Sequence, residues 1–178
     1  MEPDSTIQVV AILILILLSA FFSSAETALT TVNKHRLRAL AEEGNRNAQR
    51  VLKLIENPAK MLSAILIGNN IVNISASALT TTVTTNVFGS KFVGVSTGIL
   101  TLVVLLFGEI TPKSLATLYN EKIALIYIHV VAPLVTLLTP VIWLVDKLSG
   151  IIFFILRVDR DAANNQITEG ELRTIVDV

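Results

Sequence analysis

The chain has 178 residues, of which 52% are hydrophobic and only 16% charged, against about a quarter charged in soluble domains. Basic and acidic residues number 14 each, so the net charge of zero gives no electrostatic footprint for nucleic acid. The absence of cysteine excludes disulfides, thiolate catalysis and cysteine–zinc sites. Because the apolar residues form long blocks, we expect an all-α membrane protein rather than a soluble enzyme.

Three apolar blocks are long enough to cross a bilayer, which takes about 20 residues of α-helix. We expect the first block to be a true span rather than a cleaved signal peptide, because residues 1–6 carry Glu2 and Asp4 and lack a basic residue. A short turn over 86–91 separates the second block from the third. We therefore predict transmembrane helices over about residues 7–29, 59–88 and 92–118.

Basic residues predict the orientation of these spans. Segment 33–60 holds half of them, namely Lys34, Arg36, Arg38, Arg46, Arg50, Lys53 and Lys60. By the positive-inside rule this segment is cytoplasmic, and the N-terminus lies outside. Apolar residues at helical spacing predict that 33–58 forms a hairpin of two short helices. Three arginines after residue 156 place the C-terminus in the cytoplasm as well.

A fourth apolar block covers residues 123–158 and carries charges in its second half. We predict that Pro133 and Pro140 break its helix, because proline lacks the backbone N–H and clashes with the preceding turn. Both flanks should be cytoplasmic, so the block crosses the membrane twice or not at all. We favour a juxtamembrane belt of helices along the cytoplasmic interface. Two further spans of about 17 residues each are the alternative.

The last residues change character and mark the end of the predicted transmembrane domain, residues 1–158. Residues 159–178 are polar and then begin a helix, with Thr168 as N-cap and Glu171 completing a capping box. The apolar face of that helix begins at Leu172, and this sequence contains no later segment against which it could pack. We therefore expect 159–178 to be the start of a cytoplasmic helical region that continues beyond this sequence.

Polar residues inside the third span suggest a cation site. Pro112 cannot donate to the Gly108 carbonyl as a helical residue would, so that carbonyl is left free beside the Glu109 carboxylate. Hard oxygen ligands of this kind suit Mg²⁺ or Ca²⁺. The alternative is a proline kink in which Glu109 pairs with Lys113.

The first two spans add oxygen donors. Ser23 and Glu26 can share one helix face, as can Asn69 and Asn73. The alternatives are a helix-end carboxylate for Glu26 and interhelical hydrogen bonds for the asparagines. If these stretches converge, they form a site with few charges and several neutral oxygens. Such a site suits transport, because an ion must both bind and leave.

These motifs resemble a known family. The stretches FFSSAETAL, IGNNIVNI and FGEITPKSLA are similar to the transmembrane domain of CorB, CorC and cyclin M (CNNM) proteins. The resemblance covers residues 7 to about 118 and, more loosely, the belt region. The final ITEGELRTIVDV is similar to the helix that leads toward the paired CBS domains of that family.

The resemblance implies a homodimeric Mg²⁺ transporter of the plasma (inner) membrane with three spans per protomer and a juxtamembrane belt. It implies Mg²⁺ export by alternating access, with Na⁺ as the proposed coupling ion. The missing CBS pair would bind ATP–Mg²⁺, so we expect no nucleotide in this part of the chain. The alternatives are a Mg²⁺-binding sensor that moves no ions and a purely structural anchor. We expect no enzyme, because Ser23 has no histidine or lysine at a catalytic spacing.

The resemblance also assigns the site residues. It matches Ser23, Asn73, the Gly108 carbonyl and Glu109 to the family's ion-site positions, and Pro112 to its helix-distorting proline. Asn69 matches a further motif asparagine with a supporting role. The neighbouring polar residues Asn70, Ser24 and Glu26 are secondary metal candidates, although animal members have asparagine at the position of Glu26.

Overall fold

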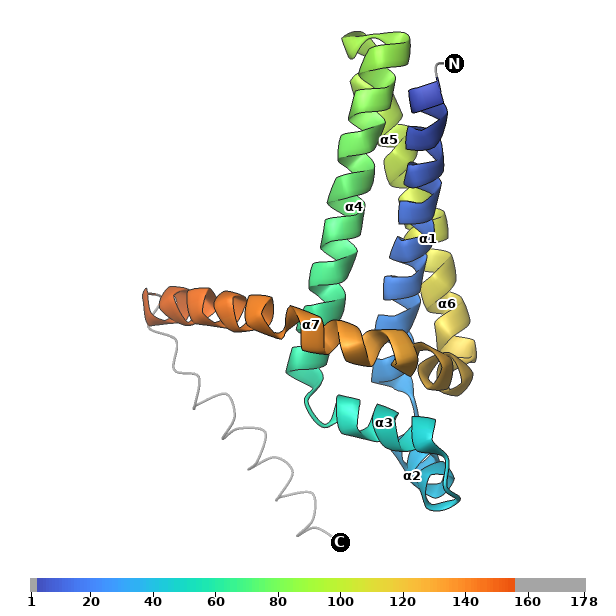
Figure 1. The fold of residues 1–178 in the computed structure, drawn as a ribbon, viewed down its shortest axis with the longest axis vertical. Coiled ribbons are helices and arrows are strands. Elements are labelled where there is room, and N and C mark those ends of the chain that lie inside the picture. The colour runs from blue at the N-terminus through green and yellow to red at the C-terminus, as the bar shows by residue number, and fades with distance from the viewer. Residues whose placement is uncertain (1–2, 156–178) are drawn as a thin grey trace, which may run out of the picture. The chain divides into compact units, whose positions relative to one another are not determined.

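The structure is a computed structural model that describes residues 3–155. All regular elements in this range are helices, as Figure 1 shows. The described residues fall into two compact units, divided between Leu138 and Thr139. The helix predicted from Thr168 and the cytoplasmic region 159–178 lie outside the described residues.

The first unit contains three long helical columns (Figure 1). Helix α1 covers Pro3–Thr31, and helix α4 covers Pro58–Phe88. The third column is built from η1 (Ser90–Phe92), α5 (Val93–Val103), η2 (Val104–Ile110) and α6 (Thr111–Leu118). Helix α1 packs against α4, η2 and α6, so it is the central element of this unit.

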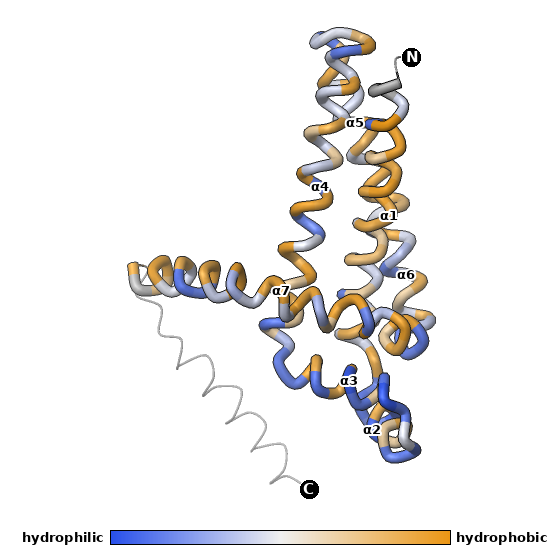
Figure 2. The backbone as a smooth tube through the Cα atoms, in the orientation of Figure 1, coloured by the Kyte–Doolittle hydropathy of each residue, from blue (hydrophilic) through white to orange (hydrophobic). Residues whose placement is uncertain are grey.

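The outer surface of these columns is apolar. Figure 2 shows hydrophobic residues along most of α1 and along the third column. Leu17 and Ile74 are each 70% exposed, although both lie in the middle of long helices. Such apolar exposure suits lipid rather than water. The chain is therefore a multi-pass, all-α membrane protein.

Among residues 3–155, the helical segments that are long and apolar enough to cross a membrane are Thr6–Thr31, Pro58–Phe88, Ser90–Leu118 and Asn120–Phe153. This criterion uses length and composition alone. The first three contain the segments that the sequence predicts as spans. The fourth covers most of the predicted belt and meets the same criterion of length and composition.

A short hairpin joins α1 to α4. It consists of α2 (Lys34–Glu42) and α3 (Arg46–Ile55), within the segment 33–58 for which the sequence predicts two helices. Each helix begins with an asparagine cap: the Asn33 side chain accepts from the N–H groups of the first turn of α2, and Asn45 does the same for α3. Between them, Gly44 has a φ of +91°, a left-handed conformation that glycine adopts without strain.

The fourth apolar block is a single helix. Helix α7 runs from Asn120 to Ile155 without interruption, so the prediction that Pro133 and Pro140 break it is wrong. Each proline removes only one N–H from the helical ladder, and its fixed φ fits helical geometry. Apolar helices tolerate such losses when neighbouring groups satisfy the freed carbonyl.

Residues 120–138 of α7 belong to the first unit and contact its other helices. The ring of Tyr127 lies 4.5 Å from the ring of Phe21 in α1, between centroids. The Asn47 side chain donates a hydrogen bond of 3.1 Å to the Leu125 carbonyl, which ties this part of α7 to α3. The salt bridge between Arg36 and Glu121 ties it to α2.

Candidate cation site

Two predicted ligands have buried oxygens without a protein partner. Among the described residues, the buried side-chain atoms that make no hydrogen bond are Ser23 Oγ and Asn73 Oδ1. Ser23 is only 1% exposed. Leaving such a group unsatisfied costs about 1–3 kcal/mol, so each one in a native structure calls for an explanation. An ion or another ligand that uses these oxygens would supply one.

Asn73 and Glu109 line the same cavity. It has a volume of about 200 Å³ and lies between α4 and the third column. The other polar side chains that line it are Ser77, Thr97 and Thr101. The site therefore offers one carboxylate, one amide and several hydroxyl oxygens, which are the donors that Mg²⁺ and Ca²⁺ prefer. Ser23 lies outside the lining of this cavity.

Sequence reasoning missed the three hydroxyl residues of this cavity. Ser77 follows Asn73 by four residues, and Thr101 follows Thr97 by four. Each pair therefore shares a helix face. The four-residue spacing from Asn73 is the signal that could have identified Ser77. Thr97 and Thr101 lie about two turns and one turn, respectively, before Val104, where the π-helix begins.

The helix that carries Glu109 is locally widened. Residues Val104–Ile110 form a π-helix, and the Thr111 N–H donates to the Leu106 carbonyl five residues earlier. Pro112 follows immediately and has no N–H for the Gly108 carbonyl. Segments of π-helix are rare in proteins, and those that do occur are often found at functional sites. Both Gly108 and Glu109 lie in this segment.

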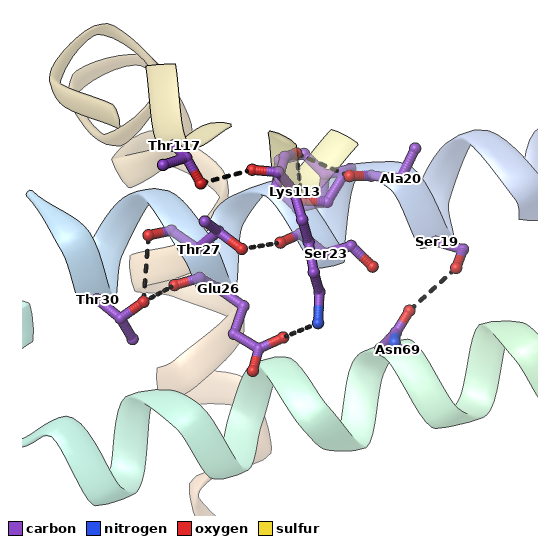
Figure 3. A network of polar contacts seen from close by, with 11 residues as sticks. Ser19, Ala20, Ser23, Glu26, Thr27, Thr30, Asn69, Lys113 and Thr117 are labelled. Atoms are coloured by element: carbon purple, nitrogen blue, oxygen red, sulfur yellow. Dashed lines mark hydrogen bonds and ion pairs between the residues drawn. The ribbon is translucent and has the colours of Figure 1, made fainter. Parts of the chain in front are cut away.

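The π-helix packs closely on α1 through Gly108. A Cβ atom at Gly108 would lie 3.1 Å from Ser19 Oγ, tighter than most real contacts. Ser19 Oγ in turn donates a hydrogen bond of 3.2 Å to Asn69 Oδ1 on α4 (Figure 3). Ser23 follows Ser19 by four residues, so it shares the face of α1 that meets η2. The secondary candidate Asn69 is thus engaged in an interhelical hydrogen bond.

Lys113 pairs with α1 rather than with its own helix. Its Nζ lies 3.2 Å from Glu26 Oε2, as Figure 3 shows. The alternative in which Lys113 pairs with Glu109 is therefore wrong for this structure, and within residues 3–155 no ion pair is recorded for Glu109. The pairing also occupies Glu26, which is half-exposed rather than buried in a cavity.

The remaining secondary candidates are placed less favourably for a cation. The Ser24 hydroxyl donates a hydrogen bond of 2.7 Å to the Ala20 carbonyl of its own helix. Asn70 is exposed on α4. Across the described residues there is no cluster of three or more histidine, cysteine, aspartate or glutamate side chains that could hold a metal. Any cation site there must rely on neutral oxygens beside Glu109.

Comparison with known proteins then places the sequence. The family model for the cyclin M transmembrane N-terminal domain matches residues 10–178. The chain belongs to the cyclin M family. The family resemblance drawn from the three span motifs is thereby confirmed.

Three similar proteins come from bacteria and carry different names. The chain is 43% identical over 160 residues to the UPF0053 inner membrane protein YfjD of Escherichia coli, which covers 89% of this chain and 37% of YfjD. It is 41% identical over 174 residues to a UPF0053 protein of Haemophilus influenzae, covering 98% of this chain and 41% of that protein. It is also 31% identical over 182 residues to the polyamine export protein of Escherichia coli, covering 95% and 40%. The chain spans about two fifths of the length of these relatives.

Proposed function

We propose that this cyclin M domain carries Mg²⁺ across the plasma membrane. The observation that supports it most is the shared cavity of Asn73 and Glu109, together with the unpartnered oxygen of Asn73. Hard cations bind carboxylate, amide and hydroxyl oxygens, and Mg²⁺ keeps several of its waters. A single carboxylate among neutral donors holds the ion weakly enough for release.

In the proposed mechanism, Asn73 binds the ion from α4, Glu109 and the Gly108 carbonyl bind it from η2, and Ser23 completes the site from α1. The π-helical segment Val104–Ile110 moves relative to α1 and opens the site to either side of the membrane. Inward movement of Na⁺ drives Mg²⁺ export. The N-terminus lies outside, and the domain works as a homodimer with a cytoplasmic CBS pair. These parts of the proposal rest on the family resemblance and the basic hairpin.

Polyamine export is a second candidate. One relative is named polyamine export protein. The oxygens Ser23 Oγ and Asn73 Oδ1 would also accept N–H donors from an ammonium group, because they have no protein partner. A sensor that binds Mg²⁺ without moving it is the remaining alternative.

The decisive experiment is ion flux in liposomes. The purified chain is reconstituted with a Mg²⁺-sensitive dye inside, and flux is measured with and without a Na⁺ gradient. Glu109→Ala is the test variant, and Glu42→Ala is the matched control, because Glu42 is an exposed carboxylate on the hairpin. A parallel set of vesicles contains radiolabelled putrescine in place of Mg²⁺.

We expect Na⁺-dependent Mg²⁺ flux that Glu109→Ala abolishes and Glu42→Ala retains. Putrescine flux without Mg²⁺ flux would overturn the proposal in favour of polyamine export. Mg²⁺ binding by calorimetry without flux would assign the domain as a sensor. Absence of both binding and flux would leave the structural anchor.

A further inference from the structure

A second cavity shares no lining residue with the cation site. It has a volume of about 440 Å³ and is formed by α3, the first turn of α4 and the first half of α7. All of its lining residues belong to the first unit. Its charged lining consists of Arg50, Lys53 and Lys60, and its apolar lining includes Met61 and Ile128. We call this cavity the basic pocket.

The positive charge of the basic pocket is uncompensated. Its lining contains three cationic side chains and no carboxylate. The ion pairs recorded within residues 3–155 use other residues, and the nearest recorded partner of Arg50 is His129, whose Nδ1 lies 3.4 Å from Arg50 Nη1. Like charges gathered at one site repel one another, so an anion bound there would be stabilised.

The start of α4 adds to this positive potential. Helix α4 begins at Pro58, and Asn57 caps it by accepting from the Lys60 N–H. The first turn carries no acidic residue. A helix N-terminus is the positive end of the helix dipole, so a lysine there is unfavourable unless an anion lies nearby. An anion in the basic pocket would meet both Lys60 and this helix end.

The apolar part of the pocket narrows the class of ligand. Met61 is 1% exposed and Ile128 is fully buried, so the floor belongs to the packed core of the unit. A free phosphate would leave such a floor unused. A lipid headgroup places its phosphate and its first acyl carbons in adjacent polar and apolar layers, which matches a cationic rim above an apolar floor.

We propose that the basic pocket binds the headgroup of an anionic phospholipid. The phosphate contacts Arg50, Lys53 and Lys60, and the glycerol and first acyl carbons lie along Met61 and Ile128. The position supports this occupant, because the pocket adjoins the first residues of the apolar helix Pro58–Phe88, where a span meets the headgroup layer. The inference is independent of the transported ion.

The test is native mass spectrometry of the purified full chain with phosphatidylglycerol and phosphatidylcholine of the same acyl chains. The pocket variant carries Arg50→Gln, Lys53→Gln and Lys60→Gln. The matched control carries Lys34→Gln, Arg38→Gln and Arg46→Gln, which remove the same charge from exposed hairpin positions outside the pocket. A third variant, Ala132→Leu, fills the pocket without changing its charge, because Ala132 lines it.

We expect one phosphatidylglycerol to bind in preference to phosphatidylcholine. The pocket variant should weaken that binding at least about fivefold. A fivefold loss of affinity is what the removal of a single basic side chain near an anionic membrane surface is expected to cause. Ala132→Leu should weaken it as well, while the matched control should keep it within about twofold. Circular dichroism confirms that each variant is folded.

Three outcomes would overturn the assignment. Equal losses in the pocket variant and the matched control would show attraction by the hairpin charge as a whole. Unchanged binding in Ala132→Leu would show that the lipid binds elsewhere. Displacement of the lipid by inorganic phosphate at equal concentration would show that the apolar floor contributes nothing, and would assign a free-phosphate site instead.

Discussion

Two polar stretches of the same helix differ in how their oxygens are satisfied. In residues 80–85 of α4, the hydroxyls of Thr80, Thr81, Thr82 and Thr85 each donate to the carbonyl four residues earlier, at 2.8–3.0 Å. In residues 68–73, the Asn69 side chain instead bonds to α1, and Asn73 Oδ1 has no recorded partner. Polar residues in an apolar helix therefore do not by themselves mark a site. The stretch whose oxygens the helix leaves unsatisfied is the one that favours a ligand.

Packing also differs along the bundle. Residues 68–73 face α1 so closely that a Cβ atom at Gly68 would lie 2.6 Å from the Phe22 ring. The third column shows the opposite near its beginning, where Gly94 has no atom within 4 Å of such a Cβ. The bundle is thus tightly packed around the candidate site and open toward residues 88–98.

The largest effect on stability is expected from Gly68→Ala. The added methyl group collides with the buried Phe22 ring, so the ring or the helix must shift, at a cost of about 1–3 kcal/mol. Gly94→Ala is the control: its methyl group meets open space, and alanine favours a helix by about 1 kcal/mol over glycine. The thermal unfolding midpoint in detergent should fall for the first variant and rise for the second. Equal shifts would contradict the packing contrast.

The next largest effect is expected from Asn73→Leu, which tests whether Asn73 binds the ion or has only a structural role. Asn73→Leu should weaken Mg²⁺ binding at least about tenfold. Substitution of a residue that only hydrogen-bonds to a metal ligand already lowers metal affinity by about that factor. In the absence of Mg²⁺, its unfolding midpoint should stay equal or rise, because the variant removes an unsatisfied buried oxygen. Calorimetry and thermal unfolding measure the two quantities.

Thr81→Val is the matched control for Asn73→Leu. Its hydroxyl is already bonded to the Ser77 carbonyl and lies eight residues further along α4. Mg²⁺ affinity should remain unchanged, and stability should change by less than about 0.5 kcal/mol. A destabilised Asn73→Leu with normal Mg²⁺ affinity would make Asn73 an interhelical contact like Asn69.

Much of the fold could be predicted from the sequence because it follows from local patterns. Apolar length predicts the long helices, and apolar residues at helical spacing predict the two helices of the hairpin. The continuity of α7 could not be predicted in this way. Proline disfavours a helix interior locally, and the surrounding contacts that outweigh this appear only in three dimensions.

The candidate site, like the fold, could be predicted from the sequence only in part. Motif residues Asn73 and Glu109 could be singled out as polar groups in apolar helices, and they line one cavity. Their partners could not, because a sequence does not tell which hydroxyls bond to their own helix. Ser24 does so, whereas its neighbour Ser23 leaves its hydroxyl without a partner. Satisfaction of hydrogen bonds is a property of the folded chain.

The smallest effect is expected from the carboxylate that already has a partner. Glu26 and Lys113 are 43% and 45% exposed at the side chain, and exposed ion pairs contribute about 0–1 kcal/mol. Glu26→Gln should therefore lower the unfolding midpoint slightly, and less at high salt. Its Mg²⁺ affinity should match that of the unmodified chain, because Lys113 occupies the carboxylate.

Lys113→Met completes the comparison through a double-mutant cycle with Glu26→Gln. If the pair acts only as a salt bridge, either single variant has the same stability as the double variant, and Mg²⁺ binding stays constant in all three. If Glu26→Gln weakens Mg²⁺ binding as strongly as Asn73→Leu, then Glu26 must leave Lys113 to reach the ion. That result would add a second carboxylate to the site and would change the charge balance on which weak binding and release depend.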